Sequence, residues 1–163
     1  MKEITLEIKI KEFDNLEELT PEDHELMLAA REAALNAYAP YSNYYVGAAV
    51  KLENGEIITG NNQENVAYPS GLCAERVALF SASAKYPGIK VKAIAITSKA
   101  KNFLVNSPVS PCGACRQVMS EYEMLAKEKI KIILMGEVGK IQVIEGIESL
   151  LPLVFKEENL KKN

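Results

Sequence analysis

The chain has 163 residues, of which 48% are apolar and 25% are charged, and its formal net charge is −3. This length and composition predict one compact domain over residues 1–163, in which residues 1–19 form an N-terminal extension. The acidic balance argues against a broad nucleic-acid-binding surface, and no apolar run approaches the roughly 20 residues that span a bilayer.

The N-terminal part of the chain predicts a strand followed by a helix. Residues 4–10 alternate between aliphatic and polar side chains, as in a half-buried strand. Thr20 is a favourable helix N-cap, and Pro21 suits the first helical position. Pro40 stops the helix that these two residues begin.

The rest of the chain alternates between strand-like and helix-like segments. In chain order these are strands at 46–52 and 56–60 around an Asn54-Gly55 turn, a helix at 73–85, a strand at 91–97, a helix at 112–127, strands at 130–135 and 141–144, and a short helix at 147–151. Strands that alternate with helices in one small domain predict an α/β fold, with an at least partly parallel sheet covered by helices.

Three cysteines stand at the predicted helix starts. Cys112 and Cys115 are three residues apart and share one helix face, while Cys73 opens the other helix. A helix N-terminus lowers the pKa of a thiol and favours the thiolate that binds metal. If the two helix starts meet, three thiolates surround one zinc ion, and the open fourth position is typical of catalytic zinc.

Two charged residues follow Cys73. Glu75 is close enough in sequence to serve as general acid and base for water, whose pKa a bound zinc ion lowers to roughly 7. Arg76 lies one helical turn from Cys73, so its guanidinium could offset the negative charge that three thiolates leave on a dication. The alternative for Arg76 is an ordinary surface residue.

The cysteines also allow uses other than a catalytic zinc site. Cys112 and Cys115 form a C-x-x-C pair, which also occurs in redox proteins and structural zinc sites. A structural site needs a fourth ligand, and His24, the single histidine, is expected on the exposed face of the first helix. The joint spacing of the three cysteines and Glu75 instead favours the zinc deaminases that act on bases.

The sequence resembles the small tetrameric zinc-dependent cytidine deaminases from about Tyr38 through Leu160. The landmarks of the resemblance are Tyr41-Ser42 with Val46-Gly47-Ala48-Ala49, Asn62-Gln63-Glu64-Asn65, Cys73-Ala74-Glu75-Arg76, Ser110-Pro111-Cys112-Gly113-Ala114-Cys115-Arg116-Gln117, and Leu150-Leu151-Pro152 with Phe155. The resemblance implies a three-layer α/β/α fold in which helices flank a mixed sheet. The segments at 1–19 and 123–131 depart from the family pattern.

The resemblance also implies roles for individual residues. These are the zinc ligands Cys73, Cys112 and Cys115, the proton shuttle Glu75, the charge-compensating Arg76, and the substrate-binding residues Asn62, Glu64, Tyr44, Ala74 and Phe155. Asn62 and Glu64 would hold the ribose 3′-hydroxyl, and Tyr44 would lie against the pyrimidine. Phe155 would reach the site of a neighbouring subunit.

The expected function is zinc-dependent hydrolytic deamination of free cytidine and deoxycytidine in pyrimidine salvage, with one zinc per chain. The resemblance implies a homotetramer with shared active sites, and no nucleic-acid or membrane partner is expected. The N-terminus has no secretory apolar block, so we expect a cytoplasmic protein. The alternatives are a blasticidin S deaminase, a polynucleotide deaminase and a non-catalytic zinc-binding module; Arg76 and the Asn62/Glu64 pair favour the nucleoside enzyme.

Overall fold

The computed structural model describes residues 1–156, so Leu160, where the resemblance ends, lies outside the described residues. The strands of this part are β1 (Ile10–Phe13), β2 (Tyr44–Leu52), β3 (Ile57–Asn61), β4 (Val91–Ala100), β5 (Lys131–Met135) and β6 (Ile141–Glu145). The helices are α1 (Pro21–Leu35), α2 (Ala74–Lys85) and α3 (Gly113–Ala126), with short 3-10 turns η1 (Leu16–Glu18), η2 (Tyr68–Ser70) and η3 (Ile147–Ser149). None of the described helices combines the length and apolar character that a bilayer crossing demands.

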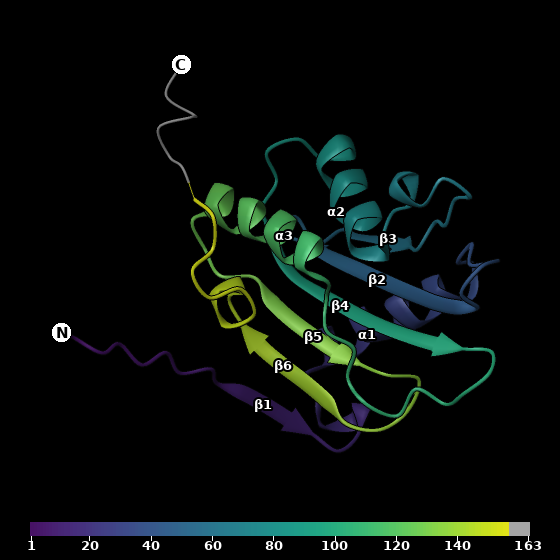
Figure 1. Cartoon of the computed structure of the whole chain (residues 1–163), viewed down its shortest axis with the longest axis horizontal. Helices are drawn as coiled ribbons and strands as arrows, with labels where there is room; N and C mark the ends of the chain where they lie inside the picture. The colour runs from purple at the N-terminus through teal and green to yellow at the C-terminus, as the bar shows by residue number, and fades with distance from the viewer. Residues whose placement is uncertain (157–163) are drawn as a thin grey trace.

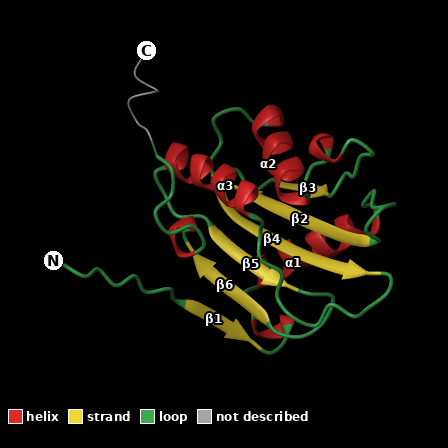
Figure 2. Cartoon of the chain, in the orientation of Figure 1, coloured by secondary structure: helices red, strands yellow, loops and turns green. Residues whose placement is uncertain are grey.

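One six-stranded sheet forms the middle layer of the molecule (Figure 1), in the order β1-β6-β5-β4-β2-β3. β4 and β5 are parallel and every other neighbouring pair is antiparallel, so the sheet is mixed. Helices α2 and α3 cover one face and α1 covers the other, as Figure 2 shows. The predicted three-layer α/β/α fold is therefore confirmed.

The two faces of the sheet bury different side chains because successive residues of a strand point in opposite directions. In β4, Ile94 and Ile96 pack under α2 and α3, whereas Ala93 and Ala95 pack against α1. Both faces of this strand are buried, which explains its nearly continuous apolar sequence.

The predicted start of the first helix is confirmed. The Thr20 hydroxyl accepts a hydrogen bond from the backbone N–H of Asp23 at 3.2 Å, and Pro21 is the first helical residue. The buried Asp23 carboxylate also pairs with the Lys131 ammonium at 3.0 Å, which ties the first turn of α1 to β5. The helix ends at Leu35, before Pro40.

Two glycines let helices approach the sheet closely on opposite faces. A Cβ built on Gly47 in β2 would overlap the carbonyl oxygen of Ala30 in α1. A Cβ built on Gly60 in β3 would lie 2.6 Å from the carbonyl oxygen of Ala74 and 2.5 Å from the backbone nitrogen of Ala78, both in α2. Only glycine fits where backbones come this close.

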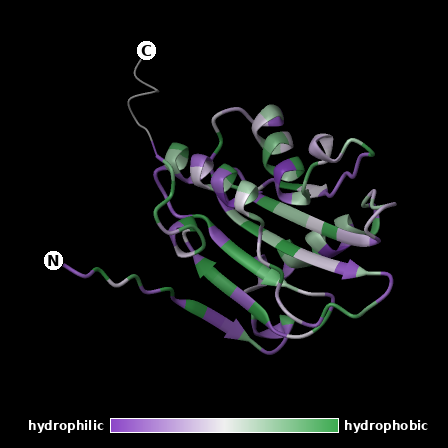
Figure 3. Cartoon of the chain, in the orientation of Figure 1, coloured by the Kyte–Doolittle hydropathy of each residue, from purple (hydrophilic) through white to green (hydrophobic). Residues whose placement is uncertain are grey.

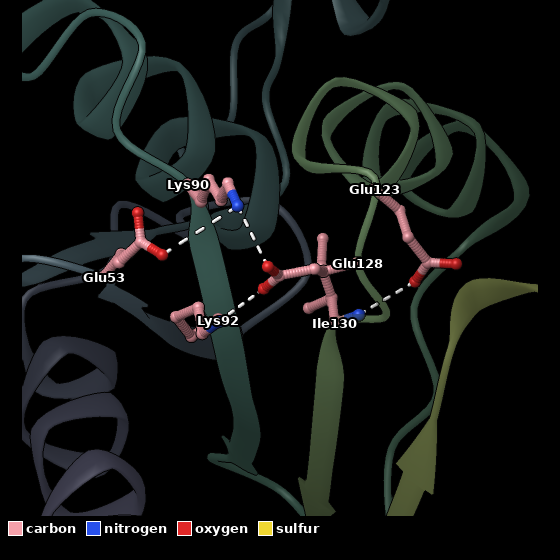
Figure 4. A network of polar contacts seen from close by, with 6 residues as sticks. All are labelled: Glu53, Lys90, Lys92, Glu123, Glu128 and Ile130. Atoms are coloured by element: carbon pink, nitrogen blue, oxygen red, sulfur yellow. Dashed lines mark hydrogen bonds and ion pairs between the residues drawn. The ribbon is translucent and has the colours of Figure 1, made fainter.

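The connection at 123–131, which departs from the family pattern, is anchored by two carboxylates (Figure 4). Glu128 accepts from Lys90 at 2.9 Å and also pairs with Lys92, so it holds the connection against the start of β4. Glu123 accepts the backbone N–H of Ile130 at 3.0 Å, which fixes the entry into β5. The extra residues are therefore part of the ordered structure.

The predicted strand at 4–10 is wrong in position. Pairing begins at Ile10, opposite Ile144, and continues to Phe13, opposite Ile141. Residues 1–9 belong to no strand, because β6 ends at Glu145 and offers no partner beyond it. The alternation of residues 4–10 is typical of a strand, but a strand also needs a neighbouring strand to pair with.

Candidate functional site

The three cysteines meet at the N-termini of two helices. Cys73 is the N-cap of α2, Cys112 is the N-cap of α3, and Cys115 lies in the first turn of α3. The sulfur of Cys112 lies 3.8 Å from that of Cys73 and 3.5 Å from that of Cys115, and all three sulfurs lie within 4.8 Å of one another. Tetrahedral zinc with Zn–S bonds of about 2.3 Å separates its sulfurs by about 3.8 Å, so this cluster fits the ion.

The surroundings of the cluster favour a thiolate at Cys73. A hydrogen bond from the Cys115 thiol and the nearby Arg76 guanidinium lower the pKa of Cys73 to about 5, whereas that hydrogen bond and burial raise the pKa of Cys115. The Arg76 Nη2 lies 4.0 Å from the Cys73 sulfur and 3.4 Å from the Gly71 carbonyl oxygen, while its buried Nε has no hydrogen-bond partner among residues 1–156. The structure therefore places the Arg76 guanidinium beside the Cys73 sulfur.

Glu75 lies in the first turn of α2 with only 4% of its surface exposed. Its side chain nevertheless lines the cavity that opens beside the sulfur cluster. Burial raises the pKa of the Glu75 carboxyl above its ordinary value, and the negative charge of Cys73 raises it further. A carboxyl group with a raised pKa holds a proton more readily than an ordinary one, which suits proton transfer.

The cavity beside the cluster has a volume of about 830 Å³, which is enough for a small molecule. Its residues come from the start of β2 and the loop before it, the segment between β3 and α2, the first turn of α2, β4 and the loop before α3. Predicted site residues among them are Tyr44, Asn62, Glu64, Cys73, Glu75, Arg76 and Cys112. Residues far apart in the sequence are thus brought to one cavity.

Asn62 and Glu64 are held rigidly at the cavity wall. The Asn62 side chain accepts from the Val46 backbone N–H at 2.8 Å and donates to the Tyr44 carbonyl oxygen at 3.0 Å. The Glu64 carboxylate accepts from the backbone N–H groups of Tyr41 and Ser42 at 2.9 and 3.2 Å and from the Ser42 hydroxyl. Desolvation opposes its ionisation, but these hydrogen bonds hold the pKa of Glu64 below its ordinary value.

The Tyr44 side chain is held in place by two residues for which the sequence predicted no role. Its hydroxyl is hydrogen-bonded to Ser98 at 2.6 Å, and its ring stacks on Phe103 with a centroid distance of 6.2 Å. Ser98 lies in β4 and Phe103 in the loop that follows it, so neither is near Tyr44 in the chain. The segment after residue 97, which was predicted to be a loop, therefore supports the cavity wall.

The predicted site residues Ala74, Cys115 and Phe155 do not line the cavity, and neither does His24; Cys115 is buried beneath it in the sulfur cluster. The Ala74 side chain is fully buried in the core, so this residue can offer a ligand only its backbone N–H. His24 lies half-buried on α1 and is not part of the sulfur cluster. Phe155 is 72% exposed and is not among the residues that line the cavity of its own chain.

The segment that carries Phe155 is bonded to the start of α3. Arg116, next to the ligand candidate Cys115, donates from Nε to the Pro111 carbonyl at 2.7 Å and from Nη1 to the Leu150 carbonyl at 2.5 Å. The Gln117 amide donates to the Phe155 carbonyl at 3.2 Å. Arg116 and Gln117 stand in the recognised cysteine motif, but nothing in the sequence indicated these bonds.

Comparisons with known proteins agree with this geometry. Residues 20–130 match the family described as the cytidine and deoxycytidylate deaminase zinc-binding region. A cytidine deaminase from Halalkalibacterium halodurans is 42% identical over 136 residues, covering 83% of this chain and 95% of the relative. A crystal structure of cytidine deaminase from Burkholderia pseudomallei superposes with a TM-score of 0.70 at 41% identity, covering 84% of this chain and 100% of the other. A blasticidin-S deaminase from Bacillus cereus is 31% identical, covering 84% of this chain and 94% of the relative.

Proposed function

This chain belongs to the cytidine and deoxycytidylate deaminases, which are zinc-dependent enzymes, and we propose that it hydrolyses free cytidine and deoxycytidine to uridine and deoxyuridine with release of ammonia. The observation that carries the proposal is the cluster of three cysteine sulfurs at two helix N-termini, with the buried Glu75 beside it in one cavity. Cys73, Cys112 and Cys115 would hold one zinc ion per chain. Bound there, zinc would supply Lewis-acid chemistry and lower the pKa of water to roughly 7.

Glu75 carries out the proton transfers in this proposal. Its carboxylate accepts a proton from the attacking water and delivers it to ring atom N3, so that oxygen can add to C4. The carboxylate then takes the remaining proton of the hydroxyl on C4 and passes it to the 4-amino group. The C4–N bond breaks, ammonia leaves, and the oxygen stays on C4 as a carbonyl. Burial of Glu75 supports this role, because a carboxyl shielded from bulk water exchanges its proton with the substrate.

The wall of the cavity favours a nucleoside over its 5′-phosphate. Among the described residues that line the cavity, Arg76 is the one basic side chain, and it already faces Cys73 and Gly71. A phosphate group normally requires arginine, lysine or a helix N-terminus, and the two helix N-termini at this cavity are taken up by the cysteine sulfurs. Deoxycytidylate is therefore expected to be a poor substrate, although the family includes deaminases of that nucleotide.

Asn62 and Glu64 are suited to a ribose hydroxyl. After the hydrogen bonds within the chain, the Asn62 amide keeps one N–H donor, and the Glu64 carboxylate keeps about one of its roughly four acceptor positions. A hydroxyl both donates and accepts, so it can use the two residues together. Because both side chains are already fixed, little conformational entropy is lost when the sugar binds.

The decisive experiment is a spectrophotometric assay that follows the loss of cytidine absorbance. Cytidine, deoxycytidine, deoxycytidylate and blasticidin S would be compared at equal concentration with the zinc-loaded protein. Turnover of the two nucleosides with little turnover of the other two compounds supports the proposal. A preference for deoxycytidylate or blasticidin S would contradict the proposed nucleoside substrates. Absence of turnover with all four compounds would contradict the proposed deaminase activity.

The proposed assembly is a homotetramer whose subunits share their active sites, with no nucleic-acid or membrane partner. The exposed Phe155, outside its own cavity, supports a role in a neighbouring subunit. A reducing compartment keeps the three thiols available to zinc, which supports the cytoplasm as the location. There the reaction would serve pyrimidine salvage.

Replacing Phe155 by alanine is expected to raise KM, because its ring would stack on a base bound in another subunit. Stacking of an aromatic side chain on a base is worth about 1–3 kcal/mol, which corresponds to about 5-fold to 150-fold in affinity. Steady-state kinetics with cytidine measures the change. The melting temperature serves as the control and should stay close to that of the parent, since the ring is exposed.

Mixed oligomers test whether the ring acts across the interface. Phe155→Ala chains co-assembled with Glu75→Gln chains contain some sites that have both native residues and some that have neither. Sites with both should show near-normal KM for cytidine, which neither homomeric variant can show. If the mixture shows only the high-KM activity of the Phe155→Ala parent, the ring serves its own subunit.

Replacing Arg76 by glutamine is expected to lower kcat/KM about 10-fold to 100-fold, the usual cost of losing a group that supports metal ligands. The positive charge beside Cys73 would be lost, and zinc would act as a weaker Lewis acid. Arg76→Lys restores the charge without the planar guanidinium and should recover part of the activity. Parent-like kinetics of the glutamine variant would mean that Arg76 has no role in the site.

A further inference from the structure

An apolar strand-like segment projects from the molecule and pairs with no strand of the described part of the chain. The N-terminal arm, residues 1–9, precedes β1 and runs away from the body in Figure 1, and its hydrophobic and hydrophilic residues alternate in Figure 3. Ile4, Leu6 and Ile8 are 75%, 60% and 51% exposed. They continue the face of Ile10, which is itself 47% exposed at the edge of the sheet.

Within residues 1–156, the fold gives the arm no partner strand. The neighbouring strand β6 ends at Glu145, and at Gly146, with φ of 86°, the backbone turns away into η3. The arm also lies outside the residues that match the family, 20–130, and outside the cavity of the proposed active site. Its alternation of aliphatic and polar residues is therefore not explained by the deaminase site.

The sequence of the arm is complementary to itself in the antiparallel direction. With Leu6 opposite Leu6 of a second chain, Ile4 stands opposite Ile8 on the apolar face. On the polar face, Glu3 stands opposite Lys9 at both ends of the pair, and Thr5 stands opposite Glu7. Opposite charges across a strand pair stabilise it, and like charges destabilise it.

The other central registers each contain a mismatch that the Leu6 register avoids. Centring the pair on Glu7 keeps the aliphatic residues opposite one another but brings the two Glu7 carboxylates together, and centring it on Thr5 brings Glu3 opposite Glu7 twice. Centring it on Ile8 pairs Glu7 with Lys9 but places Ile4 opposite the charged Glu12 at both ends. Shifting one arm by a single residue in any of these registers would place aliphatic residues opposite polar ones along the whole segment.

We infer that the arm of one chain pairs antiparallel with the arm of a second copy, with Leu6 on the two-fold axis between them. The contact is isologous, since each chain contributes residues 3–9 in the same way, and a two-fold axis of this kind occurs in dimers and in tetramers of dihedral symmetry. Because the pair continues from β1 of each chain, it joins the edges of two sheets. The arm is thus an interaction surface for the protein itself, separate from the proposed activity.

Disulfide trapping tests the register in the full-length, zinc-loaded enzyme. Directly opposite residues have Cα atoms about 4.5–5.5 Å apart, within the roughly 4.4–6.8 Å that a disulfide spans. Leu6→Cys should form a covalent dimer with oxidised glutathione at least about 10-fold faster than Ile4→Cys or Ile8→Cys alone. A mixture of the Ile4→Cys and Ile8→Cys chains should again cross-link rapidly, and the parent, whose thiols bind zinc, should not.

Charge exchange in the Leu6→Cys background provides the matched control. Lys9→Glu places Glu3 opposite a second acid and should slow cross-linking several-fold, and adding Glu3→Lys should restore the rate. Deamination should stay at the parent level in all these variants, because the arm lines no part of the cavity. Equal cross-linking at all positions, faster cross-linking at Glu7→Cys than at Leu6→Cys, or no cross-linking at Leu6→Cys would overturn the inference.

Discussion

The Glu75→Gln variant is expected to keep its zinc and its fold while kcat falls by about 10²–10⁴-fold, the usual contribution of a general acid–base group. Glutamine has nearly the same shape as glutamate but can neither accept nor release the transferred proton. Because Glu75 is buried, with 4% of its surface exposed, exchanging the carboxyl for an amide removes a group that is costly to ionise there. Stability should therefore stay the same or rise.

The measurement combines steady-state kinetics with elemental analysis of zinc and a thermal melt. Glu64→Gln is a matched control, since it removes another carboxylate of the same cavity. Its hydrogen bonds to the Tyr41–Ser42 turn indicate a binding role, so KM should change more than kcat. A Glu75→Gln enzyme that turns over at the parent rate would remove Glu75 from the chemistry.

Replacing Cys112 by serine is expected to abolish activity by removing zinc. Cys112 sits between the other two sulfurs, at 3.8 and 3.5 Å, so its loss leaves only two protein ligands. Two ligands fall short of the three that catalytic zinc sites have. The side chain is exposed, so the substitution creates no cavity in the core.

Zinc content per chain, measured after gel filtration, should fall from about one equivalent in the parent to a small fraction in the variant. Ser110→Ala changes the same loop without touching a sulfur and should retain zinc. Exhaustive chelation of the parent should also abolish deamination, and added zinc should restore it. Full zinc content in Cys112→Ser would show that the three sulfurs are not the ligands.

The sequence predicted those elements whose signals are local. The N-cap at Thr20 and the cysteines at two helix starts depend on residues within one turn, and the structure confirms both. Residues 4–10 carry an equally clear alternation, but a strand also needs a neighbour, and β6 ends at Glu145. The alternation of residues shows which side chains share a face of a strand. Whether the strand forms depends on the length of the neighbouring strand, here β6.

The hydrogen bonds that hold the site residues in place could not be predicted, because they join segments that are distant in the sequence. Ser98 fixes Tyr44 from 54 positions away, and Arg116 reaches the Leu150 carbonyl across 34 positions. Serine and arginine are common on protein surfaces, so their presence indicates nothing about these bonds. The cysteines and Glu75 could be predicted as site residues because few other reactions use that set of groups at that spacing.

The glycine beneath α2 limits how this enzyme can evolve. Any residue other than glycine at position 60 would press on Ala74 and Ala78 and displace the turn that holds Glu75 and Cys73. Displacements of about 1 Å at a reacting group can cost about 10²-fold in rate. Few substitutions under this helix are therefore expected to be tolerated, in natural sequences or in a laboratory library selected for new substrates. Substitutions should be tolerated best at the exposed rim of the cavity, at Tyr41, Gln63 and Tyr68.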